Sequence, residues 1–131
     1  MRRSRWLRWL PAVLWMAVIF WLSSRTGSEL GALFPIVERF APWIDGFNFG
    51  HFVAYFILAV FFWWGFDSDR LSVKIIVVLL CLVYGVTDEY HQTFVEGRYA
   101  DIQDLRNDGI GAILAMLFVS IPFVRTIIRR R

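Results

Sequence analysis

The stretch DEYHQTFVEGRYADIQDLRND, residues 88–108, concentrates charge in a sequence that is otherwise largely apolar. It contains six carboxylates, two arginines and one histidine, and apolar segments flank it on both sides. Carboxylates gathered away from water cannot all stay ionised without a partner. Three kinds of chemistry would neutralise such carboxylates: pairing with arginines, binding of a divalent cation, or protonation of an acid that then serves as a general acid or base.

Helical spacing predicts which side chains meet, because residues three, four or seven positions apart lie on the same face of a helix. His51 and Tyr55 form one such pair. Two further faces consist of Tyr84, Asp88 and Gln92, with Glu89 and His91 beside them, and of Asp101, Asp104 and Asp108. We expect three helices to bring one set of these side chains into a cluster: His51, Tyr55, Asp88, Glu89, Asp104 and Asp108.

Each of the three chemistries has candidate residues. Arg98 and Arg106 are the arginines that would pair with the acids in a purely structural arrangement. Histidine and carboxylates suit a divalent cation, but the spacing matches no dedicated metal motif, so we expect no metal or other cofactor and keep a divalent cation as an open alternative. Whether the chain is an enzyme is also open. The candidate catalytic residues are His51, Asp88, Glu89 and Asp104.

Binding of a ligand is a further use of such a cluster. Arg98 follows Gly97 and suits contact with a phosphate or carboxylate, although an internal salt bridge explains it equally well. The candidate ligand-binding residues are His51, Tyr55, Asp88, Glu89, Gln92, Arg98, Asp104 and Asp108. We expect His91 to be a solvated surface residue. The single cysteine, Cys81, excludes an intramolecular disulfide and fits the role of a small packing residue.

The composition indicates an integral membrane protein with one domain, residues 1–131. Hydrophobic residues make up 58% of the chain and charged residues 19%. In water-soluble domains, hydrophobic residues make up about 45–50% of the chain and charged residues about 25%. Seven tryptophans and thirteen phenylalanines suit anchoring at membrane interfaces. We therefore expect membrane lipids rather than nucleic acids as partners.

Four apolar segments approach the length of about 17–25 residues that a membrane-spanning helix needs. They are residues 6–22, 49–66, 71–87 and 105–124, and they predict an all-α bundle of four transmembrane helices. Arginine and lysine favour the cytoplasmic side. Ten of the 14 lie in the N-terminal tail, the loop between the second and third spans, and the C-terminal end. Both termini are therefore predicted to be cytoplasmic, with the charged stretch on the extracytoplasmic side.

The motifs of the chain resemble those of the VanZ-like family, whose hallmark reads D-E-x-x-Q-x-F-x-x-G-R, then D-x-x-x-[DN]-x-x-G. Here DEYHQTFVEGR begins at Asp88 and DLRNDGIG begins at Asp104. The family's upstream H-F-x-x-Y appears as HFVAY from His51, and serines end the first span at Ser23 and Ser24. The resemblance covers essentially the whole chain.

Two positions depart from the family pattern. Asn48 stands where the family often has a lysine, and Ala115 stands where a second glycine is common. Without the lysine, one cation is missing near the cluster, and any anion-binding role of that position is in doubt.

The resemblance implies a four-span protein of the bacterial cytoplasmic membrane. The family is named for a protein associated with low-level resistance to teicoplanin, so a role in the cell envelope and in antibiotic susceptibility is an expectation. Together with the residues, it favours binding of the head group of a lipid or lipid-linked envelope precursor. A membrane-embedded lipid phosphatase and a structural subunit of a membrane complex are the alternatives.

Overall fold

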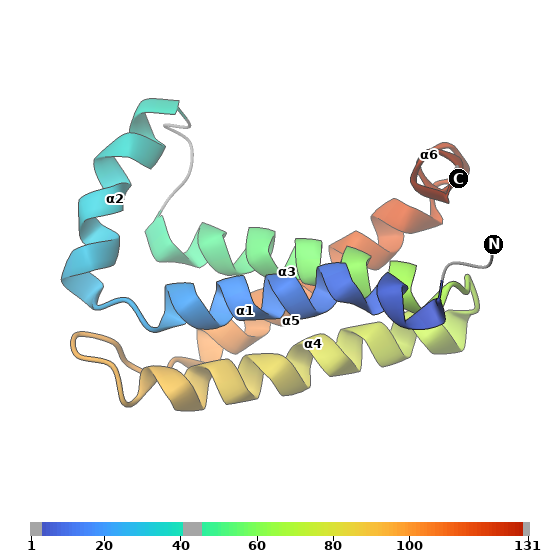
Figure 1. Cartoon of the computed structure of the whole chain (residues 1–131). Helices are drawn as coiled ribbons and strands as arrows, with labels where there is room; N and C mark the ends of the chain where they lie inside the picture. Colours follow the sequence, from blue (N-terminus) through green and yellow to red (C-terminus); the bar gives the residue numbers. More distant parts are fainter. Residues whose placement is uncertain (1–3, 41–45, 130–131) are drawn as a thin grey trace.

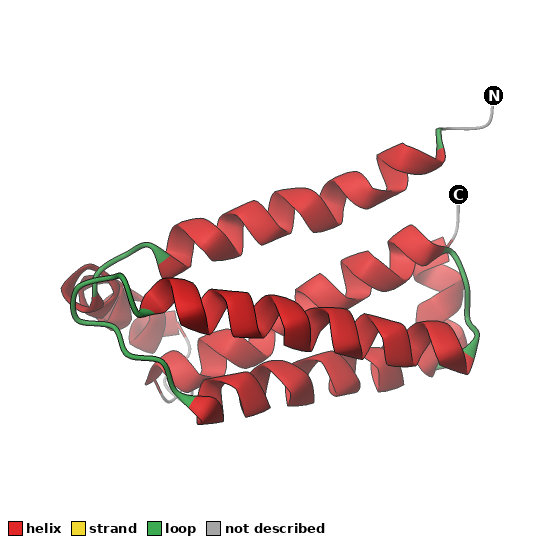
Figure 2. Ribbon diagram, turned by 90° about the horizontal axis from the view of Figure 1, so that it is seen from below, coloured by secondary structure: helices red, strands yellow, loops and turns green. Residues whose placement is uncertain are grey.

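The computed structural model describes residues 4–40 and 46–129, and every regular element within them is a helix. In chain order these are η1 (Arg5–Trp9), α1 (Leu10–Ser23), α2 (Gly27–Phe40), α3 (Gly46–Phe66), α4 (Leu71–Gln92), α5 (Ile102–Ser120) and α6 (Pro122–Arg129). Helices α1, α3, α4 and α5 run side by side and alternate in direction (Figures 1 and 2). The predicted all-α class is confirmed for the described part of the chain.

Within residues 4–40 and 46–129, three stretches of helix are long and apolar enough to cross a membrane: Arg5–Ser23, Phe49–Phe66 and Leu71–Gln92. Helices α5 and α6 pass the same test together, but an 88° bend separates them.

The predicted fourth span, residues 105–124, is therefore wrong in its bounds, since α5 begins at Ile102 and ends at Ser120. Pro122 is the cause, because the residue before a proline avoids helical backbone. Ile121 accordingly adopts an extended conformation.

The outer surface of the bundle is apolar, whereas its interior contains polar groups. Exposed large hydrophobic residues follow α1, α4 and α5, among them Val13, Leu14, Phe20, Leu79, Val83, Val86, Ile113, Leu114 and Leu117. In the part of the chain that the structure describes, the buried polar residues are Ser23, Asp88, Glu89, Gln92, Asn107 and Asp108. This distribution suits a lipid environment, because apolar side chains are stable in contact with hydrocarbon whereas ionisable side chains are costly there. The helices and their surface together indicate a membrane protein.

Two elements differ from the predicted arrangement. Helix α4 continues beyond the apolar segment 71–87 to Gln92, so that the acids at 88 and 89 lie on its last turns. Helix α2 has no counterpart among the predicted spans; it lies beyond one end of the bundle (Figure 1).

The contact between α3 and α5 is the most extensive among the described helices, and small residues permit it. A Cβ atom at Gly111 would lie only 2.6 Å from the carbonyl oxygen of Phe52 on α3. A Cβ atom at Gly85 would lie 2.7 Å from a carboxylate oxygen of Asp108. These two glycines therefore allow the close approach of the helices. Gly50 has no such role, because a Cβ atom there would have no atom of another described element within 4 Å.

The apolar core lies between these helices. Its fully buried members include Leu58 and Trp63 of α3, Val77 of α4 and Val119 of α5. Cys81 is also fully buried, which agrees with its predicted role as a packing residue.

Ion pairs gather at the end of the bundle that carries η1 and α6 (Figure 1). Nη2 of Arg8 lies 2.9 Å from Oδ1 of Asp67. Nη1 of Arg129 lies 3.3 Å from Oδ2 of Asp69, and its guanidinium stacks over the ring of Trp63. The first and last described helices thus share one end of the bundle. That this end is cytoplasmic stays a prediction.

Candidate functional site

The polar cluster, defined as His51, Tyr55, Asp88, Glu89, Asp104 and Asp108, lies at the other end of the bundle. Here α1 and α4 end while α3 and α5 begin (Figure 1). Because consecutive helices alternate in direction, the last turns of α4 meet the first turns of α3 and α5. The spacing within each helix puts its cluster residues on one face, and the antiparallel packing of the helices brings those faces together.

His51 lies between two aspartates of α5. Its Nδ1 atom is 2.7 Å from Oδ1 of Asp108, within hydrogen-bond distance, and its Nε2 atom is 3.6 Å from Oδ2 of Asp104. The two aspartates are four positions apart, so one face of α5 presents both to the ring. The contacts fix the orientation of the imidazole.

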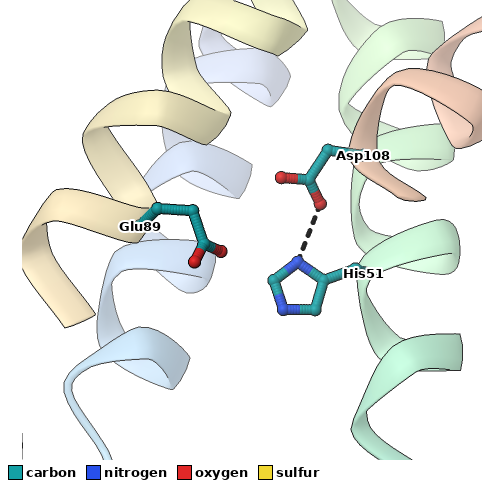
Figure 3. Close-up of side chains that lie close together, drawn as sticks. All are labelled: His51, Glu89 and Asp108. Atoms are coloured by element: carbon teal, nitrogen blue, oxygen red, sulfur yellow. Dashed lines mark hydrogen bonds and ion pairs between the residues drawn. The ribbon is translucent and has the colours of Figure 1, made fainter. Parts of the chain in front are cut away.

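Glu89 approaches the same imidazole from α4, as Figure 3 shows. Its Oε2 atom accepts a hydrogen bond of 2.8 Å from the backbone N–H of Asp101. Asp101 in turn caps α5 by accepting from the N–H of Gln103. The Oε1 atom of Glu89 and the Oδ2 atom of Asp108 are buried and have no hydrogen-bond partner among the described residues.

Asp88 forms a second set of contacts beside the histidine. It accepts hydrogen bonds from the hydroxyl groups of Ser23 on α1 and Tyr55 on α3. All three residues are buried. Asp88 therefore joins the ends of α1 and α4 to α3. Tyr84, on the same face of α4, instead donates to the backbone carbonyl of Met16.

The arginines do not neutralise the cluster. Among the described residues, no ion pair joins Arg98 or Arg106 to its carboxylates. Arg98 donates to the carbonyl oxygen of Arg25, and Arg106 is exposed. The purely structural pairing considered from the sequence is therefore wrong here. Arg98 still lies within electrostatic range of Asp104, which places it beside the cluster rather than in it.

Two other polar residues of α4 flank the cluster. Gln92 is 1% exposed, and its Nε2 atom has no partner among the described residues. The expectation that His91 is a solvated surface residue is wrong. It is partly buried and its ring stacks on Phe20 with centroids 4.3 Å apart.

Ser23 and Asn107 are buried polar residues that are not among the predicted candidates. The partner of Ser23 is on a different helix, so no periodicity could reveal it. Its position at the end of a span, shared with the VanZ-like pattern, is the available signal. Asn107 lies three positions after Asp104, so the spacing rule that selects the aspartates could have found it as well.

A metal ion would find one set of ligands in this site. His51, Glu89 and Asp108 each offer one ligand atom, and these atoms lie within 4.8 Å of one another. They come from α3, α4 and α5, and Figure 3 shows the carboxylate of Asp108 above the imidazole and that of Glu89 to its left. Among the described residues, this is the set of three that comes close enough together to share an ion.

The arrangement agrees with a comparison of the whole sequence with known families. The model of the VanZ/LLP1 family matches residues 8–125. The chain belongs to the VanZ/LLP1 family. The match includes every residue of the polar cluster, and the resemblance expected from the sequence motifs is thereby confirmed.

One curated relative is the uncharacterized protein C11E3.10 of Schizosaccharomyces pombe, which is 34% identical over 68 residues. The aligned segment covers 51% of this chain and 42% of the yeast protein. The chain thus matches less than half the length of this relative. No solved structure matches the chain.

Proposed function

We propose that this VanZ/LLP1-family protein binds the polar head group of a lipid or lipid-linked precursor in the polar cluster. The observation that carries the proposal is the pair of buried oxygens without partners among the described residues, Oε1 of Glu89 and Oδ2 of Asp108. Buried polar atoms nearly always have a hydrogen-bond partner. A head group with hydroxyl or amine donors, or with a bound cation, would supply what these oxygens lack.

The position of the cluster supports a ligand drawn from the bilayer. It lies where candidate spans end, which is the depth of lipid head groups. Exposed aromatic residues surround this end, namely Trp21, Tyr90 and Tyr99. Tryptophan and tyrosine favour the membrane interface. A lipid in this layer would reach the cluster without leaving the membrane.

Arg98 is the proposed contact for the phosphate of such a head group. Its guanidinium has five N–H donors, and one nitrogen donates to the carbonyl oxygen of Arg25. Guanidinium groups suit phosphate because two parallel hydrogen bonds can form. We expect Arg98 to contact the phosphate from the rim, while the acids and His51 contact the same head group through its hydroxyl or amine donors or through a bound cation.

The predicted topology gives this function a place in the cell. With both termini cytoplasmic, the cluster lies toward the extracytoplasmic side, where lipid-linked precursors of a bacterial envelope are used. A protein that withholds or presents such a precursor would alter susceptibility to teicoplanin in a bacterial host. This part of the proposal rests on the family resemblance and on the charge distribution of the loops.

Binding of phosphorylated lipids to the purified full chain tests the proposal. The protein in neutral phosphatidylcholine nanodiscs is titrated with phosphatidic acid, and with diacylglycerol as the matched lipid without phosphate. We expect saturable binding of phosphatidic acid that weakens at least tenfold, or ~1.4 kcal/mol, in Glu89→Gln and in Asp108→Asn. Equal affinity for both lipids, or unchanged binding in these variants, would contradict it.

A second function, hydrolysis of a lipid phosphate ester, is favoured by the contact between His51 and Asp108. An imidazole oriented by a carboxylate at 2.7 Å is the arrangement of a general base. The same nanodiscs distinguish the two functions through release of inorganic phosphate. Turnover that disappears in His51→Gln would favour hydrolysis, and saturable binding without turnover would favour head-group recognition alone.

A further inference from the structure

Three residues of the polar cluster, here called the donor set, carry more negative charge than their hydrogen bonds compensate. His51, Glu89 and Asp108 bring one imidazole and two carboxylates from three different helices to within 4.8 Å. Asp88 and Asp104 add further carboxylates beside them. Among the described residues, no lysine or arginine pairs with this group. A buried charge without a counter-charge is strongly destabilising.

Two oxygens without partners among the described residues point to what neutralises this charge. The side chain of Asp108 is 0% exposed and its Oδ2 atom is one of them. Glu89 is 8% exposed, and its Oε1 atom is the other. In Figure 3 the carboxylate of Glu89 faces the ring of His51 from the side opposite the α5 helix. The two carboxylates and the imidazole therefore surround a position that a cation could share.

We propose that His51, Glu89 and Asp108 bind one divalent cation, and that this cation holds the phosphate of the head group. The second step rests on the proposed function, whereas the first stands without it. One imidazole nitrogen and two carboxylate oxygens suit Mn²⁺ or Zn²⁺ better than Ca²⁺. Three protein ligands leave coordination positions open for a phosphate oxygen.

The distances are close to those that one ion requires. Ligand atoms at about 2.0–2.2 Å from an ion are at most about 4.4 Å apart. A separation at the limit of 4.8 Å would have to shrink by about half an ångström. Glu89 can supply this movement by a small shift of its carboxylate, since Oε2 accepts from the backbone N–H of Asp101 whereas Oε1 has no hydrogen bond among the described residues. Helices α3 and α5 remain in place.

Titration of the detergent-solubilised full chain with Mn²⁺ alone tests the site. We expect one saturable site per chain by calorimetry, with nitrogen couplings from an imidazole in the electron spin-echo spectrum of the bound Mn²⁺. Binding should weaken at least tenfold in Glu89→Gln, Asp108→Asn and His51→Gln. The matched controls Glu96→Gln and His91→Gln, which alter a carboxylate and an imidazole outside the donor set, should bind as the wild type does.

Two further measurements distinguish loss of the site from loss of the fold. Circular dichroism establishes that each variant keeps its helices, and Mn²⁺ should raise the melting temperature of the wild type but not of Glu89→Gln. Binding that lacks nitrogen couplings, or that is equal in the site variants, would reveal surface-bound ions and overturn the site. Absence of saturable binding would mean that protons neutralise the acids, which also overturns it.

Titration of phosphatidic acid with and without a chelator then separates the two proposals. Binding that requires Mn²⁺ supports both. Lipid binding that persists in chelator overturns the cation's role in holding phosphate and leaves head-group recognition intact. Mn²⁺ binding without any lipid binding leaves the cation site intact and overturns the proposed function.

Discussion

The Nδ1 atom of His51 lies 2.7 Å from Oδ1 of Asp108, although 57 positions separate the two residues in the sequence. The contact depends on the close approach of α3 and α5, which Gly111 permits one turn further along α5. Packing and site geometry are thus coupled: a change that separates the helices also separates the histidine from its aspartate. The following predictions use this coupling and the contacts around it.

Gly111→Ala should destabilise the protein by about 1–3 kcal/mol, because added volume in a packed contact forces the backbone to move. Its Cβ atom would meet the carbonyl oxygen of Phe52 at 2.6 Å. Thermal unfolding in detergent measures the effect. Gly50→Ala is the matched control, since a Cβ atom there has open space and alanine favours a helix by roughly 0.5–1 kcal/mol. A similar loss in both variants would contradict the role of Gly111.

Ser23→Ala should lower the free energy of unfolding by about 1–3 kcal/mol, because it removes a hydrogen bond to a buried carboxylate. Ser23 donates to Asp88, and both are buried. The neighbouring Ser24→Ala removes an exposed hydroxyl that bonds to the carbonyl of Phe20, and we expect little change from it. Chemical or thermal unfolding of the two variants side by side makes the comparison. Equal stabilities would show that Asp88 does not depend on α1.

Tyr55→Phe removes the second donor to Asp88, and its effect should not be additive with that of Ser23→Ala. Two donors to one acceptor form a coupled group, for which interaction energies of roughly 0.5–3 kcal/mol are usual. Unfolding of the wild type, both single variants and the double variant gives this energy. An interaction energy near zero would mean that the two hydroxyls act on Asp88 independently.

Arg98→Ala should weaken binding of phosphatidic acid by about tenfold or more, since hydrogen bonds to charged groups contribute about 1.5–3 kcal/mol. Arg106→Ala is the matched control, because Arg106 is exposed and makes no ion pair with the described residues of the cluster. Nanodisc titrations at two salt concentrations measure both. If the two variants lose affinity to the same extent, general attraction between basic residues and the anionic lipid explains the effect better than a contact by Arg98.

A reporter fused after Arg131 should be active only in the cytoplasm, and one inserted after Gly97 only outside it. The expectation comes from the ten basic residues that the sequence assigns to one side. Enzymatic reporters specific for each compartment provide the measurement. The opposite pattern would move the polar cluster to the cytoplasmic face and remove envelope precursors from the proposed ligands.

Periodicity within a single helix is sufficient to find most of the cluster. His51 and Tyr55, or Asp104 and Asp108, share a face because four residues complete about one turn, whatever surrounds the helix. Alternating helix direction then brings these faces to one end. The acids of the cluster can therefore be selected before their neighbours are known.

Contacts between helices could not be predicted in this way. Gly85 and Gly50 look equivalent in sequence, yet a Cβ atom would collide with Asp108 at the first and meet open space at the second. Arg98 has the charge to pair with the acids, but it donates to a backbone carbonyl of Arg25. In contrast, the end of α5 could have been predicted from the sequence, since Pro122 restricts the backbone of the residue before it.

The bend after Ser120 has a consequence for the surrounding lipid. Helix α5 has 19 residues, which gives a length of about 28 Å, and its first two turns carry the buried acids. Only the remaining, apolar part can face hydrocarbon, so we expect the bilayer to thin beside α5 or water to enter from the surface. Either response would shorten the path between a lipid phosphate and the imidazole, and local membrane thickness would then help to determine which lipids reach the site.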